Sequence, residues 1–315
     1  MTIFISNLYE AFNITSPIFL MLILGIVLKK RQIITPAFID TGSKLVFNLT
    51  LPAMLFLSIV KTPIGQAADL HLLSFALISN ALIWGILMLA THWSPYPFAV
   101  TRVMVQGAFR ANTGIIGVAL MSNAYGEQGV AASAYYVAVI TLLYNVLAVI
   151  CLTPSGSHSN PGKMIKLLSR NPLILSILIA STFKLTNIEL PDVILISSSY
   201  FADMTLPLAL LCTGASLDFK QMKLNPWPGL ISTTARLIIV PSIIVIAAIL
   251  LGFRDSALAL LFFMSASPTA AASYVMAKAM KGDDRLAANI IAMTTLGFVF
   301  TTSAGLAILK SYGLG

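Results

Sequence analysis

SASPTAAASYVMAKAM, residues 265–280, places Pro268 inside a segment that is otherwise apolar enough to cross a bilayer. Proline lacks a backbone N–H and its ring crowds the preceding turn, so a helix kinks or breaks there. In hydrocarbon, freed backbone groups are tolerated only where protein or a water-filled cavity covers them. The small side chains around Pro268 allow another helix or a ligand to approach closely. The stretch therefore predicts a broken helix that forms one side of a binding site.

The composition predicts an integral membrane protein, with the lipid bilayer as its surroundings. Of its 315 residues, 58% are hydrophobic and 10% are charged, whereas a soluble domain carries about 25% charged residues. The net charge of +8 comes mostly from basic residues in short connections between apolar runs. Topology rules place them there, so no nucleic-acid partner is expected. Cys151 and Cys212 lie within apolar segments and are interpreted as small buried hydrophobic side chains.

Ten apolar segments are long enough to cross a bilayer of about 30 Å at about 1.5 Å rise per residue. In chain order, spans 1–10 are residues 12–28, 39–60, 70–90, 103–124, 131–152, 172–185, 193–217, 230–251, 257–280 and 286–309. The expected fold is an all-α polytopic membrane protein. Residues 1–153 and 172–315 would form two five-helix repeats, joined by a cytoplasmic linker at residues 154–171.

The basic residues of the connections predict the orientation. Twelve lysines and arginines fall on one side of the alternating spans and four on the other, and the richer side is expected to be cytoplasmic. Both termini would then be periplasmic or extracellular, in a multi-pass protein of the cell inner (plasma) membrane.

A weak internal repeat relates the two halves at an offset of 155 residues. It aligns Thr-Leu-Pro at residues 50–52 with the same tripeptide at 205–207, and residues 112–113 with 267–268. Each half holds an odd number of spans, so the second must be inverted relative to the first. Inverted repeats with paired broken helices are typical of secondary transporters, whose substrate binds near the membrane midplane.

Span 4 supplies the counterpart of the Pro268 break. Residues 107–120 read GAFRANTGIIGVAL, and each glycine within it lowers helix stability by roughly 1 kcal/mol relative to alanine. Glycine-mediated helix packing would also explain this composition, but the repeat favours a binding site. Half-helix N-termini present free N–H groups and a positive dipole end, which suit a carboxylate. The predicted substrate-binding residues are Arg110, Asn112, Thr113, Gly114, Gly117, Ser267, Pro268 and Thr269.

Ionisable residues within the spans suggest further roles. Asp203 lies ten residues into span 7, about 15 Å deep, and its counterpart in the repeat is Asn48. Asp203 is either an acid that couples transport to a cation or a structural acid that neutralises Lys44 or Arg110. Lys44 and Arg236 lie within about two turns of the cytoplasmic face and are expected to snorkel to the interface. Three basic residues against one acid favour an anionic substrate.

Enzyme motifs are absent from the sequence. No H-E-x-x-H, G-x-S-x-G or P-loop motif occurs, and the three histidines do not pair at metal-ligand spacing. A single deep aspartate cannot form the carboxylate dyad of an aspartyl protease. We expect no enzyme activity, no cofactor and no metal site.

Four stretches resemble the auxin efflux carrier family of membrane transporters. They are residues 45–56 (LVFNLTLPAMLF), 112–120 (NTGIIGVAL), 205–217 (TLPLALLCTGASL) and 267–295 (SPTAAASYVMAKAMKGDDRLAANIIAMTT). The resemblance covers essentially the whole chain and is to a compact prokaryotic member of the malonate/malate-permease type. It implies a fold similar to bile-acid–sodium symporters, with crossing broken spans 4 and 9. Spans 1, 2, 6 and 7 would form a scaffold, and spans 3–5 and 8–10 an elevator-like core that carries an organic anion.

The sequence departs from the family pattern in span 4. Members of the family often have a proline there, whereas this sequence has Gly-Val-Ala at residues 117–119. The span-4 break is therefore expected to be gentler and to depend on Gly114 and Gly117. The expected function is secondary transport of a mono- or dicarboxylate by alternating access. The alternatives are a sodium-coupled symporter of the bile-acid type, a non-transporting sensor or a channel. Substrate, direction, coupling to H+ or Na+ and assembly into a homodimer stay open.

Overall fold

The computed structural model describes residues 2–61, 69–153, 172–186, 188, 190–217 and 226–314. Within these residues the structure is helical apart from connections and one isolated antiparallel β-bridge, between Ala111 and Thr269. Seven of the described helices are long and apolar enough to cross a membrane, and shorter apolar helices accompany them. An all-α polytopic membrane protein is thus confirmed at this level. The predicted linker, residues 154–171, lies outside the described residues.

The first half of the chain follows the predicted apolar runs. Its helices are α1 (Thr2–Lys30), α2 (Pro36–Leu45), the π-helix η1 (Val46–Thr50), α3 (Leu51–Lys61), α4 (Leu70–Ala90), the 3-10 helix η2 (Thr91–Trp93), α5 (Phe98–Phe109), the π-helix η3 (Thr113–Gly117) and α6 (Val118–Leu152). Gly126 interrupts α6 with a φ of +58°, a conformation that glycine adopts without steric cost. The kink falls where the sequence predicts the connection between spans 4 and 5.

The second half also contains helix in every predicted apolar run. Its helices are α8 (Pro172–Thr186), α9 (Asp192–Ser216), α10 (Pro226–Thr234), the π-helix η5 (Ala235–Ile239), α11 (Val240–Leu250), α12 (Asp255–Ala266), α13 (Ala272–Ala279) and α14 (Asp284–Ser311). Three further apolar helices are shorter than these membrane-crossing helices, with 10–17 residues each: α5, α8 and α12. Of these, α12 ends at the predicted break before Pro268, and α5 ends at Phe109, within the stretch 107–120 in which the sequence predicts the other break.

Prolines account for several irregularities of these helices. Pro52 follows the last residue of η1 by two positions, and Pro241 follows η5 in the same way. Because proline cannot donate to the carbonyl four residues earlier and crowds it, the preceding turn widens into a π-helix. Ser267 has extended angles, φ −60° and ψ 144°, as expected of the residue before a proline. Helix α12 therefore ends just before Pro268.

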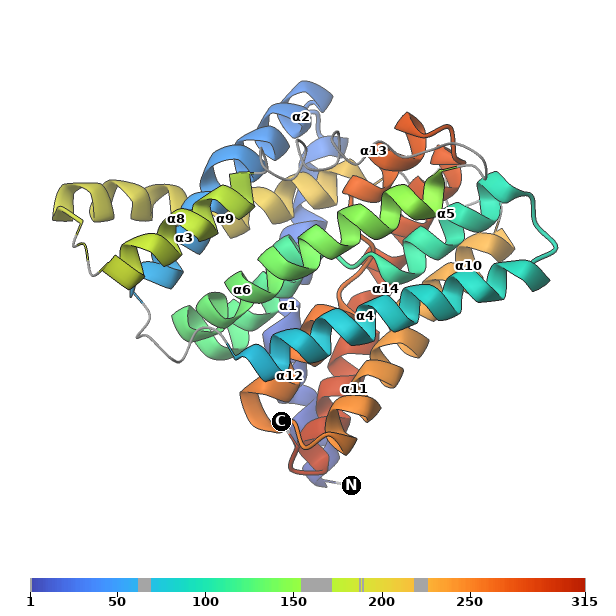
Figure 1. Cartoon of the computed structure of the whole chain (residues 1–315). Helices are drawn as coiled ribbons and strands as arrows, with labels where there is room; N and C mark the ends of the chain where they lie inside the picture. Colours follow the sequence, from blue (N-terminus) through green and yellow to red (C-terminus); the bar gives the residue numbers. More distant parts are fainter. Residues whose placement is uncertain are drawn as a thin grey trace.

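Helix α1 packs along both α9 and α14, and α3 packs against α8 and α9. The α1–α14 contact brings the chain ends together at one end of the molecule, opposite α2 and α13 (Figure 1). There the Lys310 ammonium pairs with a carboxylate oxygen of Glu10 at 2.7 Å, and Asn7 donates to Ser311 at 3.0 Å. The division into a scaffold and a mobile core stays a prediction.

Glycines bring α1 and α9 unusually close. A Cβ atom placed on Gly214 would lie 2.1 Å from the backbone oxygen of Leu22, and one on Gly25 would lie 2.3 Å from that of Leu211. Small residues of this kind let membrane helices approach backbone to backbone. The α1–α9 pair is thus a tightly packed unit.

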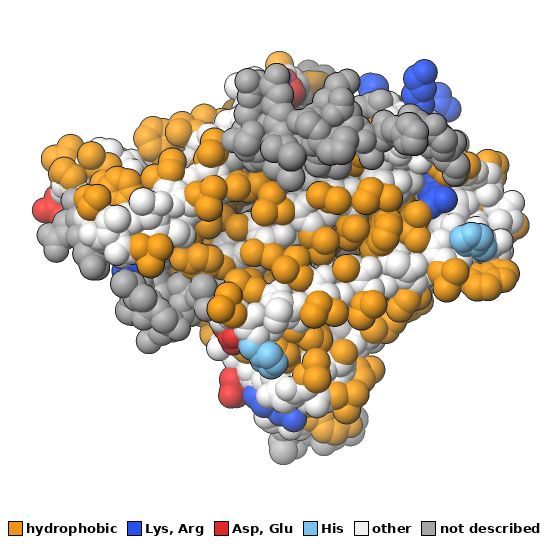
Figure 2. Space-filling model, viewed as in Figure 1, with side chains coloured by type: hydrophobic (Ala, Val, Ile, Leu, Met, Phe, Trp, Pro, Cys, Tyr) orange, Lys and Arg blue, Asp and Glu red, His pale blue; other side chains and the backbone are white. Residues whose placement is uncertain are grey.

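The surface of the molecule is largely apolar. Figure 2 shows hydrophobic side chains across the middle of one face, with charged side chains mostly towards its ends. On α4, for example, Ile78, Leu82 and Ile86 are each more than half exposed. A contiguous apolar surface of this extent would be unstable in water and is expected where lipid surrounds the protein.

Candidate binding site at a crossing of two broken helices

Both predicted helix breaks are present. Helix α5 ends at Phe109, and Arg110 (ψ 90°) and Asn112 (ψ 61°) leave the helical conformation before η3 resumes it at Thr113. Helix α12 ends at Ala266 and α13 begins at Ala272, after a five-residue segment that contains Pro268.

The two breaks hydrogen-bond to each other. The backbone N–H of Asn112 donates to the oxygen of Pro268 at 2.7 Å, and that of Ala270 donates to the oxygen of Arg110 at 3.0 Å. These bonds flank the bridge between Ala111 and Thr269. Backbone groups that leave a helix inside a membrane protein need such partners. The structure thus brings the predicted residues of spans 4 and 9 together as a short antiparallel crossing.

Threonine side chains fasten this crossing to its neighbours. The hydroxyl of Thr269 donates to the backbone oxygen of Gly107 at 2.7 Å, near the end of α5. The backbone N–H of Thr269 donates to the hydroxyl of Thr294, on α14, at 3.1 Å. Both threonine side chains are buried, so these bonds are shielded from competing water.

The span-4 break was expected at Gly114 and Gly117, and this expectation is wrong. The break lies at residues 110–112, before both glycines, because these residues pair with the Pro268 segment. Gly117 serves packing: a Cβ there would lie 2.6 Å from the sulfur of Met264 and 3.3 Å from the hydroxyl of Ser267. At Gly114 a Cβ would make only ordinary contacts, at 3.8 Å.

Arg236 is fully buried and does not snorkel, which corrects the sequence-based expectation. Its Nη1 atom donates to the backbone oxygens of Ala108 at 3.0 Å and Phe109 at 2.8 Å, and its Nη2 atom donates to that of Ser265. These oxygens lie in the last turns of α5 and α12, where carbonyls lack helical partners and carry partial negative charge. The guanidinium therefore ties together the C-terminal ends of both broken helices.

Arg110 is the second buried arginine of the crossing, with 6% of its surface exposed. Its guanidinium donates to the backbone oxygen of Tyr144 at 3.2 Å and to the side-chain oxygen of Asn145 at 2.8 Å. The Tyr144 hydroxyl in turn donates to the side chain of Asn80 at 2.9 Å. The sequence did not predict these partners, although Asn80 and Asn145, each a single asparagine inside an apolar run, could have indicated them.

Neither arginine has a carboxylate partner in the described part of the chain. The ion pairs found there are Lys44–Asp40 and Lys310–Glu10, both with partly exposed side chains. Asp203 is exposed on α9, and it neutralises neither Lys44 nor Arg110, whose side chains bond elsewhere. One of the two roles left open for Asp203, the structural partner of those cations, is therefore not realised.

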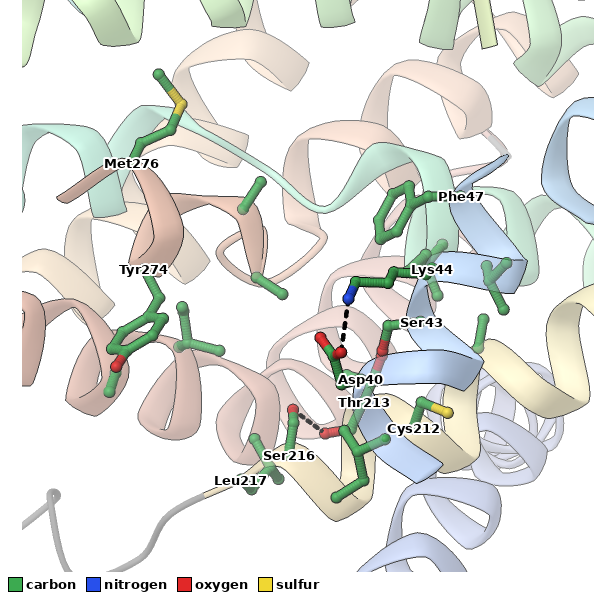
Figure 3. A pocket seen from close by; sticks show the side chains of 18 of the residues that line it. Asp40, Ser43, Lys44, Phe47, Cys212, Thr213, Ser216, Leu217, Tyr274 and Met276 are labelled. Carbon is green, nitrogen blue, oxygen red and sulfur yellow. Dashed lines mark hydrogen bonds and ion pairs between the residues drawn. The ribbon is translucent and has the colours of Figure 1, made fainter. Parts of the chain in front are cut away.

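A cavity of about 1260 Å³ adjoins the crossing. Figure 3 shows α2 and α9 on one side of it, with Lys44 paired to Asp40 at 2.7 Å, and Tyr274 of α13 on the other side. The lining residues that belong to the crossing or bond to it are Arg110, Ile115, Asn145, Ala271 and Ala272.

The cavity carries an excess of positive charge. Lys29, Lys44, Arg110 and Arg285 line it, against Asp40 and Asp284. Lys29 lies at the end of α1 and Arg285 at the start of α14, so the cavity extends from the crossing to the helix ends. Within the described ranges, no three His, Cys, Asp or Glu side chains gather as metal ligands.

The structure places the predicted site residues differently. Arg110 and Asn48 line the cavity, and the Asn48 amide donates to the backbone oxygen of Lys44 at 2.8 Å. The residues in or next to the crossing are Asn112, Ser267, Pro268 and Thr269, whereas Thr113, Gly114 and Gly117 belong to η3, which follows it, and Asp203 is exposed on α9. Asn112 occupies the N-cap position of η3, yet its side chain makes no capping hydrogen bond.

Comparison with known proteins gives a consistent family match. The model of a family described as membrane transport protein matches residues 12–304. An uncharacterized transporter of Methanothermobacter thermautotrophicus is 21% identical over 285 residues, 89% of this chain and 92% of its own. One of Methanocaldococcus jannaschii is 26% identical, over 80% of this chain and 84% of its own. The uncharacterized transporter YfdV of Escherichia coli K12 is 22% identical, over 90% and 93%.

Proposed function

Because the chain belongs to the membrane transport protein family, the auxin efflux carrier family that its sequence resembles, and is a membrane transporter and not an enzyme, we propose that it carries a small organic anion. The cargo would be a mono- or dicarboxylate, moved by alternating access. The proposed architecture has ten spans in two inverted repeats, with α5–η3–α6 and α12–α13 as the paired broken helices.

The charge balance of the crossing is the observation that supports an anionic cargo. A helix C-terminus carries about −0.5 of an elementary charge, so the ends of α5 and α12 together approximate one negative charge. Arg236 contacts both ends and offsets that charge. Arg110 is left as a buried cation with uncharged partners at the cavity wall. A buried charge without a counterion is costly, and a bound carboxylate would remove that cost.

The backbone near the cavity adds to this potential. Helices η3 and α13 begin at the crossing, and their first N–H groups have no acceptor earlier in their own helix. Ile115, Ala271 and Ala272, from these first turns, line the cavity. We assign the carboxylate to this region, held by Arg110 and by the N–H groups of these first turns, with Asn112 next to them in the crossing.

The same cavity suggests the conformational state. Its volume exceeds the usual range for small-molecule sites, about 300–1,000 Å³, so it serves as an access route as well as a site. Its lining includes Lys29, Pro36 and Arg285, and α2, which begins at Pro36, lies with α13 at the end of the molecule opposite the two termini (Figure 1). We place the opening of the cavity at this end. With the termini outside the cell, this is an inward-open state. Movement of α13 and α14 relative to α2 and α9 would close it in an elevator-type cycle.

The test uses the purified full-length protein. A thermal-shift screen of mono- and dicarboxylates identifies the ligand, and uptake of that ligand is then measured in proteoliposomes. Arg110→Gln removes the cation and keeps hydrogen-bonding capacity, and we expect it to reduce binding and uptake by about tenfold or more. Arg254→Gln, an exposed arginine outside the cavity, serves as the matched control. Unchanged carboxylate affinity in a folded Arg110→Gln protein would refute the site; binding without uptake would indicate a sensor.

A further inference from the structure

Three backbone carbonyl oxygens next to the crossing accept hydrogen bonds from one buried cation, the guanidinium of Arg236. They belong to Ala108 and Phe109 at the end of α5 and to Ser265 at the end of α12. Helix ends expose carbonyls that their own helix cannot satisfy. Here the ends of two helices far apart in the sequence share one guanidinium, that of Arg236.

The helix that carries Arg236 is built to hold this position. One turn earlier, the hydroxyl of Ser232 on α10 donates to the backbone oxygen of Met104 on α5 at 2.8 Å. Together with Arg236 on η5, this segment contacts α5 at two points. The π-helix η5 begins at Ala235 and widens the turn that carries Arg236. Such π segments frequently occur at functional sites. Nearby polar groups include the phenols of Tyr136 and Tyr144, which are uncharged at neutral pH.

Carbonyl clusters of this kind bind metal cations in other broken-helix carriers. In such transporters, unwound backbone carbonyls and the C-terminal ends of half-helices coordinate the coupling sodium ion or proton. A guanidinium offers the same single positive charge and, being planar with five donors, can serve several carbonyls at once. It cannot dissociate during a transport cycle, because it is covalently attached.

We propose that Arg236 is a tethered cation that takes the place of a coupling sodium ion at the crossing. The negative ends of α5 and α12 are then permanently compensated, and the crossing binds its anion without Na+. A sodium ion within about 4 Å of the guanidinium would bind roughly a thousandfold more weakly, at an effective dielectric constant near 20. The inference rests on the proposed anion transport, and it argues against the sodium-coupled alternative.

The experiment replaces the tethered cation with a diffusible one. Arg236→Ala removes the shared donor of the three carbonyls, of which Phe109 keeps only its bond from the backbone N–H of Ala111 at 3.1 Å. We expect a lower melting temperature and slower uptake in choline chloride. Methylguanidinium or sodium at millimolar concentration should restore part of the melting temperature, by about 2 °C or more. Arg254→Ala is the matched control, because its guanidinium also donates to carbonyls, of Ile249 and Phe253, but is exposed. It should show no cation dependence.

Melting temperatures are read without substrate, so this test stands even if no carboxylate is transported. Wild-type protein should melt at the same temperature in sodium and in choline, and a rise with millimolar sodium would overturn the proposal. So would an Arg236→Ala protein that melts and transports like wild type in choline alone, or one that no added cation stabilises. If Arg236→Ala does not fold, Arg236→Lys keeps a tethered charge and must remain indifferent to sodium; sodium dependence there would also overturn the proposal.

Discussion

The two glycines of span 4 give opposite predictions for the same substitution. Alanine at Gly117 would place its Cβ 2.6 Å from the sulfur of Met264 and 3.3 Å from the hydroxyl of Ser267. Non-bonded carbon atoms prefer separations of about 3.5–4.0 Å, so Met264 would have to shift by about 1 Å. Met264 and Ser267 are both fully buried, and the Ser267 hydroxyl is fixed by a 2.8 Å bond to the oxygen of Phe263.

The magnitude follows from two opposing terms. Overpacking of a buried site costs about 1–3 kcal/mol, and replacing a helical glycine by alanine returns about 1 kcal/mol. The net loss for Gly117→Ala is therefore about 0–2 kcal/mol. We expect about 1 kcal/mol, because methionine can adjust part of the way. At Gly114 the nearest atoms, of Leu51 and Val137, would lie at 3.8 Å. Gly114→Ala should therefore be neutral or stabilising by up to about 1 kcal/mol.

Thermal unfolding of the two variants in one detergent provides the assay. A change of 1 kcal/mol shifts the melting temperature by about 2–4 °C for domains of 150–250 residues. The two variants should therefore differ by about 2 °C or more, with Gly117→Ala the lower. Equal melting temperatures, or a lower value for Gly114→Ala, would contradict the close approach of span 9 to Gly117.

Two further substitutions test other contacts. Asn145→Asp places a carboxylate at the 2.8 Å contact with the Arg110 guanidinium; it should neutralise that cation and lower carboxylate uptake by about tenfold or more in proteoliposomes while the protein stays folded. Gly214→Ala would bring a Cβ within 2.1 Å of the backbone oxygen of Leu22, which cannot move aside. We expect a loss of about 2 kcal/mol or more by thermal unfolding, whereas Gly85→Ala, where a Cβ meets open space, should lose no stability.

Much of the helical architecture could be predicted from the sequence because its signals are local. Apolar runs of sufficient length indicate membrane helices whatever their neighbours are. Proline changes the backbone at its own position, so the break at Pro268 could be placed to within a few residues. The repeat then pointed to residues 112–113 as the partner of that break, and the structure pairs Asn112 directly with Pro268.

The features that escaped prediction depend on tertiary contacts. The break at residues 110–112 contains no proline or glycine, and it is stabilised by hydrogen bonds to the span-9 segment. The depth of Arg236 in its span was compatible with snorkelling, since depth does not indicate which way a side chain points. Its direction is set by the packing of α10 against α5 and by the π-helix η5, which contains Arg236. No single-sequence pattern carries that information.

The structure also changes the basis for expecting an anion. The sequence offered a count of three basic residues against one acid, as if all contributed alike. In the structure Lys44 is exposed and paired with Asp40, and Arg236 is occupied by the carbonyls of two helix ends. Arg110 alone combines burial, a place at the cavity wall and the lack of a carboxylate partner among the described residues. Selectivity for an anion should therefore depend on one side chain. Neutralising Lys44 should leave this selectivity nearly intact, because its charge is exposed to solvent and already paired with Asp40.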